Sequence, residues 1–280
     1  MIINKNSGPQ YRHQGNKVEK NKEGENQSFH VKHKEKNSVQ IVAGMRPVME
    51  ALNSGKQIDK IFIQSNLEGQ LAQELKQKIK ELSLPVQYVP VEKLNRMSDS
   101  NHQGIIATIS PISYYAFADL LQKVVDEGRS PFFVMLDHVT DVRNLGAIVR
   151  TAECAGVDAI VVPDRGSAQV NEDAIKSSSG ALLRLPMCRE SNLKTVVNLA
   201  RQYGMQICAA TEKGSVSYLS VDFRKPTLLI MGAEDTGISN ELLKISDVRA
   251  SLPIVGEVQS LNVSVAAGVF VYEMLRQRSL

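Results

Sequence analysis

The chain has 280 residues, of which 42% are hydrophobic and 22% charged, and its formal net charge is +3. This length allows one large domain or two ordinary ones, and the composition is that of a soluble globular protein. Three cysteines without paired spacing argue against a disulfide framework, and no segment reaches the roughly 18 apolar residues of a membrane span. The N-terminus lacks the apolar core of a secretory signal, so we expect a cytoplasmic protein.

Residues 1–38 form a polar and basic segment. They contain eight Lys or Arg residues and four Glu, with few apolar residues among them. We therefore expect a disordered tail. Two interpretations remain open: an arm that adds salt-sensitive attraction to nucleic acid, or a solubilising extension without a partner.

Residues 39–111 are expected to form a small α/β domain. A polar loop over 93–104 would carry Arg96, His102 and Gln103, which could contact phosphate or simply be solvated. Residues 112–130 are interpreted as a linker and the first helix of the next unit. The patterns of the small domain predict helices over 41–55 and 68–82, and strands over 60–64, 86–89 and 104–110.

In residues 131–280, predicted strands and helices alternate throughout. This alternation indicates an α/β domain with a mostly parallel sheet and helices on both faces. Ligand sites in such sheets lie beyond the carboxyl ends of the strands. The predicted strands cover 131–136, 159–163, 182–187, 205–211, 227–232 and 249–254, and the predicted helices 144–155, 171–179, 191–203, 239–245 and 262–278.

Several common site motifs are absent from the sequence. No G-x-G-x-x-G follows a strand, which argues against an ordinary dinucleotide-binding fingerprint, and no phosphate-binding G-x-x-x-x-G-K-[ST] loop occurs. The G-x-S-x-G turn of many hydrolases is absent as well. No cluster of His and Cys suggests a metal. We therefore expect no metal in the site.

Polar residues follow three of the predicted strands. Asn144 begins a helix on which Arg150 points away from the apolar face, and Glu234 follows Gly232, which would let a ligand approach the backbone. Each has an ordinary alternative, as helix cap, solvated arginine or turn carboxylate. The polar segment Gln259 to Asn262 precedes an apolar helix, and either Ser260 or Asn262 can act as its N-cap.

Taken together, these segments resemble the three motifs of the SpoU family of RNA ribose 2′-O-methyltransferases. The motifs are NLGAIVRTA (144–152), GAEDTGI (232–238) and LPIVGEVQSLNVSVA (252–266). The stretches GMRPVMEAL (44–52) and HQGIIA (102–107) are similar to the family's ribosomal-protein-L30e-like substrate-binding domain. They favour the branch that modifies a guanosine of bacterial large-subunit ribosomal RNA. Asp235–Thr236 and Leu183–Arg184 depart from the patterns often seen in the family.

The resemblance implies a fold, a cofactor and an assembly. The fold is a SPOUT-type sheet whose C-terminal segment forms a deep trefoil knot, the methyl donor is S-adenosylmethionine, and the protein is a homodimer that binds RNA. The resemblance assigns three groups of residues: around the ribose Asn144, Arg150, Glu234, Ser260 and Asn262; around the methyl donor Thr211, Gly232, Leu252, Ile254 and Leu261; and as RNA contacts Arg46, Arg96, His102, Gln103 and Arg143.

The family places Arg150 at the ribose hydroxyl. A guanidinium hardly deprotonates in proteins, so we interpret Arg150 as orienting the hydroxyl and stabilising charge, and leave the proton acceptor open. Two alternatives to ribosomal RNA methylation remain. The substrate could be transfer RNA, or the chain could be an RNA-binding assembly factor without catalytic activity.

Overall fold

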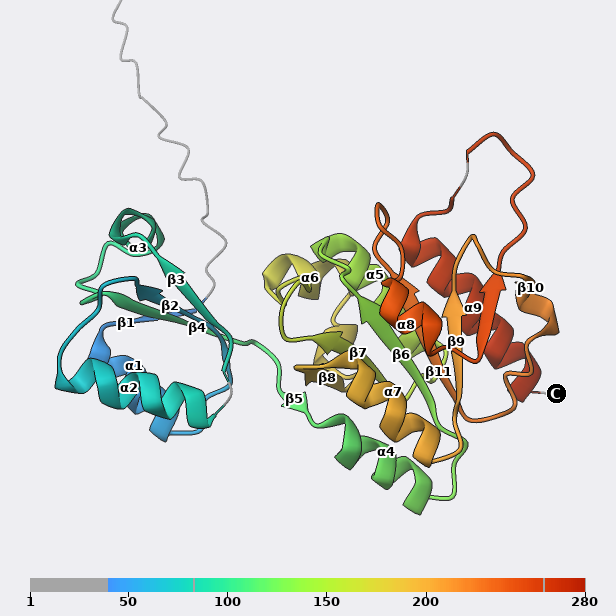
Figure 1. Cartoon of the computed structure of the whole chain (residues 1–280), viewed down its shortest axis with the longest axis horizontal. Coiled ribbons are helices and arrows are strands. Elements are labelled where there is room, and N and C mark those ends of the chain that lie inside the picture. The colour runs from blue at the N-terminus through green and yellow to red at the C-terminus, as the bar shows by residue number, and fades with distance from the viewer. Residues whose placement is uncertain (1–39, 83, 259, 280) are drawn as a thin grey trace, which may run out of the picture. The chain divides into compact units, whose positions relative to one another are not determined.

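The structure is a computed structural model that describes residues 40–82, 84–258 and 260–279. The predicted tail and Gln259 lie outside these ranges. Within them the chain forms a four-stranded and an eight-stranded sheet, both flanked by helices (Figure 1). None of the helices in the described ranges has the length and apolar character needed to cross a bilayer.

The small sheet has the strand order β1-β4-β2-β3, with only β2 and β3 parallel. Helices α1 and α2 pack their apolar side chains on one face, and α3 packs Leu94 on the other. The elements are β1 (Ile41–Ala43), α1 (Met45–Asn53), β2 (Ile58–Gln64), α2 (Gln70–Glu81), β3 (Val86–Val89), α3 (Val91–Met97) and β4 (Ile105–Ile109).

Two predictions for this region are wrong. The predicted helix over 41–55 begins only at Met45, because Ile41–Ala43 pair antiparallel with β4 as an edge strand. The predicted loop over 93–104 is helical as far as Met97, since Leu94 is buried against β2 and β4 and holds this turn on the sheet. Both elements leave only a weak pattern in the local sequence, because β1 has three residues and α3 has a single buried residue, Leu94.

The large sheet is parallel at every strand pair, in the order β10-β12-β9-β11-β6-β7-β8-β5. This confirms the predicted fold class. The elements are β5 (Tyr114–Tyr115), α4 (Phe117–Asp126), β6 (Phe132–Asp137), α5 (Val142–Cys154), β7 (Ala159–Pro163), α6 (Glu172–Ser177), β8 (Met187–Glu190), α7 (Leu193–Gln202), β9 (Gln206–Ala210), β10 (Val216–Ser217), β11 (Thr227–Gly232), α8 (Asn240–Lys244), β12 (Val248–Ser251) and α9 (Val263–Arg278).

Side chains of the central strands alternate between two cores. On β6, Phe132 and Val134 face the core shared with α5, α6 and α9, whereas Phe133 and Met135 face the core shared with α4 and α7. Both faces of the sheet are therefore buried, as continuous apolar strands predict. The predicted strand over 182–187 is wrong, because Ala181–Leu183 form a 3₁₀ turn and the strand starts at Met187.

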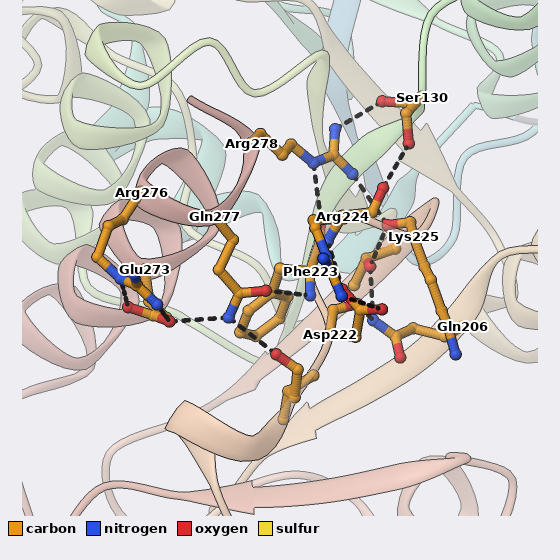
Figure 2. Close-up of polar contacts among 12 residues, drawn as sticks. Ser130, Gln206, Asp222, Phe223, Arg224, Lys225, Glu273, Arg276, Gln277 and Arg278 are labelled. Carbon is orange, nitrogen blue, oxygen red and sulfur yellow. Dashed lines mark hydrogen bonds and ion pairs between the residues drawn. The ribbon is translucent and has the colours of Figure 1, made fainter. Parts of the chain in front are cut away.

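The C-terminal end of α9 is tied to the amino-end loops of the sheet by polar side chains (Figure 2). The Arg278 guanidinium donates to four backbone carbonyl oxygens, those of Ser130, Pro131, Phe223 and Lys225, at 2.6–3.2 Å. The Gln277 side chain accepts from the Phe223 N–H at 2.8 Å and donates to the Val221 carbonyl at 2.9 Å. We call Glu273, Gln277 and Arg278, with these acceptors, the α9 clasp.

Candidate active site

The first candidate residues meet at the N-terminus of α9. Asn262 is its N-cap: the side-chain oxygen accepts from the Ser264 N–H at 2.9 Å and from the Val265 N–H at 3.4 Å. Its side-chain amide donates to Asn144 Oδ1 at 3.0 Å and to Glu234 Oε1. Asn262 therefore caps the helix and also contacts Asn144 and Glu234, which lie 118 and 28 positions earlier in the chain. Of the two candidate caps in the sequence, the structure uses Asn262.

Asn144 does not cap its own helix. Asp141 is the N-cap of α5, and its carboxylate accepts from the Asn144 N–H at 2.8 Å. The Asn144 side chain is therefore free to reach Asn262. Gly146 lies one turn above the cap, where a Cβ would come within 1.8 Å of Ser177 Oγ. In the N-x-G motif, the asparagine thus contacts the site, and the glycine allows α5 and α6 to pack closely.

A cavity of about 320 Å³ opens beside this network, at the carboxyl ends of β9, β11 and β12. Apolar side chains, including Met231 and Phe270, line one side of it. The predicted donor-site residues Thr211, Gly232, Leu252, Ile254 and Leu261 all line the cavity, together with Glu234 and Ser260 from the predicted ribose site. The structure therefore brings residues of the second and third motifs to one place.

The hairpin after β11 explains why Gly232 is a glycine. Ala233 and Gly237 exchange both backbone hydrogen bonds, at 3.2 and 3.0 Å, which folds residues 233–237 back over the strand end. A Cβ on Gly232 would lie 2.2 Å from the Gly237 carbonyl carbon. The close approach expected at this position is therefore made by the protein's own hairpin, which places Glu234 at the cavity.

Arg150 lies apart from this network. It follows Asn144 by six residues, which corresponds to roughly 9 Å along the helix and a different face. Its side chain is exposed, and among the described residues we find no hydrogen bond or ion pair to it. Arg143 is also exposed and lies seven residues earlier, so the two guanidinium groups share a face of α5.

In the N-terminal region, His102 and Gln103 line a wide hollow with the end of α3. His102 is buried: Gly104 N–H donates to its Nδ1 at 3.0 Å, so Nε2 carries the proton and donates to Asn95 Oδ1 at 2.8 Å. Both ring nitrogens therefore hold the turn. Gln103, at φ +48°, accepts from the Met45 N–H at the start of α1, beside the exposed Arg46. Arg96, on α3, is exposed as well.

Several residues at the cavity were not predicted. Glu212 and Lys213 follow β9 directly after Thr211, and Asp235 extends from the hairpin. The rule that ligands bind beyond strand ends applies to all three, so their position was a usable signal. Phe270 carried no such signal, because a buried aromatic in an apolar helix is indistinguishable from core. Within the described ranges, no group of three or more His, Cys, Asp or Glu could hold a metal ion.

Comparison with known proteins assigns the family. The model of the SpoU rRNA methylase family matches residues 131–272, and that of the RNA 2′-O-ribose methyltransferase substrate-binding domain matches residues 41–115. A curated protein of Staphylococcus haemolyticus, assigned to the TrmH family of tRNA/rRNA methyltransferases, is 34% identical over 85% of this chain and 96% of its own length. YacO of Bacillus subtilis, assigned likewise, is 32% identical with the same coverage. The chain belongs to the SpoU family of RNA methyltransferases.

Solved structures agree with this assignment. The SpoU methyltransferase AviRb from Streptomyces viridochromogenes, in complex with AdoMet, has a TM-score of 0.53 and 26% identity and covers 85% of this chain and 90% of its own. An AdoMet-bound rRNA methyltransferase from Sinorhizobium meliloti has the same TM-score and 25% identity, with coverage of 84% and 86%. The TrmH/SpoU tRNA-modifying enzyme of A. aeolicus is 30% identical at a TM-score of 0.50, and covers 57% of this chain and 85% of its own. The predicted class of enzyme and cofactor is confirmed.

Proposed function

We propose that the protein transfers a methyl group from S-adenosylmethionine to a ribose 2′-hydroxyl, on a guanosine of large-subunit ribosomal RNA. The observation that carries this proposal is the network of Asn262, Asn144 and Glu234 at the edge of the cavity. It gathers side chains from all three motifs at the carboxyl edge of a parallel sheet, where ligands bind in such folds. A cytoplasmic location belongs to the same proposal.

The cavity suits the methyl donor in size and chemistry. Its volume of about 320 Å³ lies within the range of small-molecule sites. Leu252, Ile254 and Leu261 offer apolar contacts, while Thr211 and the backbone at Gly232 offer polar ones. Bound there, the donor supplies an electrophilic methyl group on a sulfonium. These residues would hold the donor beside the network at Asn262.

The residues at the cavity edge would position the ribose. Ser260 provides a neutral hydroxyl, and the Asn262 amide, which Glu234 and Asn144 hold in place, would exchange one of these two contacts for the ribose. Methyl transfer would require the hydroxyl oxygen to be held in line with the donor's carbon–sulfur bond and to give up its proton to an acceptor. Arg150 orients the hydroxyl and stabilises the developing charge. Presenting a ribose from folded RNA requires the nucleotide to be splayed out.

Ribosomal RNA is favoured over transfer RNA by the extent of the structural matches. The Sinorhizobium rRNA methyltransferase covers 84% of this chain, whereas the tRNA-modifying enzyme covers only 57% of it. The substrate-binding part, residues 41–115, would contact the RNA. We propose Arg46, Arg96, Gln103 and Arg143 as direct contacts, with His102 holding the turn that presents Gln103.

A homodimer forms part of this proposal. Val265 and Tyr272 lie seven residues apart on α9 and are 53% and 50% exposed, a feature typical of a surface that a partner covers. Arg150 lies on the neighbouring helix α5, which packs against α9. An interface on these helices would bring Arg150 close to a second copy and its bound ribose.

The proposal is tested with purified protein, S-adenosylmethionine labelled in the methyl group, and unmodified ribosomal RNA, with transfer RNA in parallel. The RNA is digested to nucleosides. We expect labelled 2′-O-methylguanosine from ribosomal RNA alone. Label only in transfer RNA would overturn the substrate but keep the reaction. Donor binding without methylation of naked RNA or of precursor ribosomal particles would favour the non-catalytic assembly factor.

Arg150→Ala tests the assignment of the catalytic arginine. Because Arg150 does not line the cavity, donor affinity should stay within about twofold, while methyl transfer falls by roughly 100-fold or more. Calorimetric titration and single-turnover assays measure the two effects. Arg224→Ala, which removes an exposed arginine from the opposite edge of the sheet, is the matched control. Full activity of the Arg150 variant would remove this residue from the mechanism.

A further inference from the structure

A buried carboxylate links the loop that leads to Asn144, at the start of α5, with the loop that carries Glu234. Asp137 is the last residue of β6 and pairs in register with Gly232, the last residue of β11. It is 1% exposed, although a buried charge is costly unless hydrogen bonds satisfy it. A carboxylate in this position, at the strand ends that form the site, needs an explanation beyond packing.

Each oxygen of Asp137 binds a different loop. Oδ1 lies 2.6 Å from Nδ1 of His138, the first residue of the loop to α5. Oδ2 accepts from the Ser239 N–H at 2.7 Å, where the hairpin after β11 ends and α8 begins. One loop leads to Asn144 and the other carries Glu234. The carboxylate therefore joins the bases of the two loops.

The start of α5 and the hairpin after β11 meet again at Asn262, whose amide donates to Asn144 and to Glu234. The contacts thus form a closed circuit, with Asp137 at the buried end and Asn262 at the exposed end. A shift of either loop at Asp137 would change the spacing of the two acceptors that orient the Asn262 amide. This geometry makes the buried carboxylate a determinant of the site.

The backbone at His138, beside this contact, is strained. His138 has φ +61°, a left-handed conformation that is unfavourable for a non-glycine residue. The ring is held by Asp137 and packs closely on Gly166, where a Cβ would lie 2.8 Å from the His138 Cδ2 atom. Such strain persists only where the surroundings fix it.

We propose that Asp137 is a positioning residue for methyl transfer, which sets the distance between Asn144 and Glu234 without touching the substrate. This inference rests on the proposed function. Asp137→Ala removes both contacts. Asp137→Asn keeps them, because its oxygen can accept from the Ser239 N–H while its amide donates to Nδ1 of the other His138 tautomer.

Asp158 offers a matched control at the opposite end of β6. Its carboxylate side chain is 5% exposed, accepts from the backbone N–H of Phe132 at 2.8 Å and pairs with Arg129. It resembles Asp137 in burial and in its partners but lies at the amino edge of the sheet. Asp158→Ala should therefore destabilise the protein to a similar degree without disturbing the site.

The test compares the three variants in single-turnover methyl transfer at saturating donor and RNA, at a temperature where all are folded. We expect Asp137→Ala to lower the rate at least tenfold, and Asp137→Asn and Asp158→Ala to stay within threefold of the parent. Equal losses for Asp137→Ala and Asp158→Ala, or full activity of Asp137→Ala, would overturn the proposal. Should Asp137→Ala fail to fold, His138→Ala, which removes one of the two contacts, replaces it with an expected loss of at least threefold.

A second measurement does not depend on activity. In protein labelled with ¹⁵N-asparagine, the Asn262 side-chain amide is assigned by its loss in Asn262→Asp. Its signals should shift in Asp137→Ala and stay unchanged in Asp158→Ala. If the parent protein methylates no RNA, the proposed function fails, and these signals alone decide the structural role of Asp137. An unchanged Asn262 amide in Asp137→Ala would refute the coupling.

Discussion

The two ends of α9 are held in contrasting ways. At the N-terminal end, the exposed Asn262 caps the helix and joins Asn144 and Glu234 through a single amide. At the C-terminal end, Arg278 donates to four carbonyl oxygens, and burial lowers the pKa of its guanidinium from the usual value (Figure 2). The N-terminal end of α9 therefore presents exposed polar groups beside a cavity. At the C-terminal end, the side-chain donors of Arg278 bind backbone carbonyl oxygens of the same protein.

This difference suggests that the N-terminal end of α9 serves catalysis and the C-terminal end serves stability. Hydrogen bonds at an exposed network can be exchanged for contacts with a ligand at small cost, whereas an unsatisfied buried carbonyl costs about 1–3 kcal/mol. We therefore expect changes at Asn262 to act on the reaction and changes in the α9 clasp to act on unfolding. Each of the following substitutions tests this division.

Among substitutions at the two ends of α9, Asn262→Ala should have the largest effect on activity. It removes the amide that joins the two loops, and the rate of methyl transfer should fall roughly 100-fold, while loss of the cap lowers the free energy of unfolding by about 1 kcal/mol. Asn192→Ala is the control, because Asn192 caps α7 and accepts from the Lys194 N–H at 2.9 Å. A similar loss of activity in the control would assign the effect to capping alone.

Arg278→Ala should have the largest effect on stability. Four carbonyl groups lose a charged donor, so the free energy of unfolding should fall by about 2–3 kcal/mol, measured by urea denaturation. The rate per folded molecule should stay within twofold. Arg224→Ala serves as the control, since its side chain is 72% exposed and pairs only with Asp222 among described residues; its loss should cost less than about 1 kcal/mol.

Glu273→Gln tests the charge within the clasp. Hydrogen bonds from Arg276 hold the pKa of Glu273 below its usual value of 4.5. The folded state therefore gains stability from the ionised form above about pH 4.5, and this gain is lost as pH falls through the lowered value. Melting temperatures should show the variant less stable at neutral pH by about 1 kcal/mol, with a difference that shrinks on acidification. A constant difference would contradict this account.

The cysteines provide a smaller, local signal. Burial raises the pKa of both the Cys188 and the Cys208 thiol to about 12, whereas Cys154 is exposed. A thiol reagent at pH 8 should therefore modify one cysteine per native chain, and none in Cys154→Ser. Cys208 lies in the core that contains α9. In chains that also carry Cys154→Ser, the Cys208 thiol should react faster in the Arg278→Ala variant than in the Asn262→Ala variant. Equal reaction rates would contradict the proposed difference between the two ends of α9.

Much of the large sheet was predictable because its strands are continuous apolar segments between polar loops. The predicted strand over 227–232 coincides with β11, and that over 159–163 with β7. The predictions that proved wrong depended on distant partners: Ile41–Ala43 become a strand only through pairing with β4. Locally, three apolar residues before a helical pattern look like the beginning of that helix.

The site was predictable to a similar degree. The motifs pointed to Asn262 and Glu234, but no spacing in the chain indicated that one amide would join them to Asn144. The buried circuit at Asp137 was also hidden, since an aspartate at a strand end is ordinary in a turn. Both depend on register between β6 and β11, which pairs Asp137 with Gly232 across 95 residues of chain.

The α9 clasp also affects how the protein is made. The acceptors of Arg278 at Ser130 and Pro131 lie 148 and 147 residues earlier in the chain. During synthesis, α9 can therefore be secured to the sheet only after Arg278 has left the ribosome. A chain truncated before Arg278 would contain every residue of the candidate site, yet the end of α9 would lack these four hydrogen bonds.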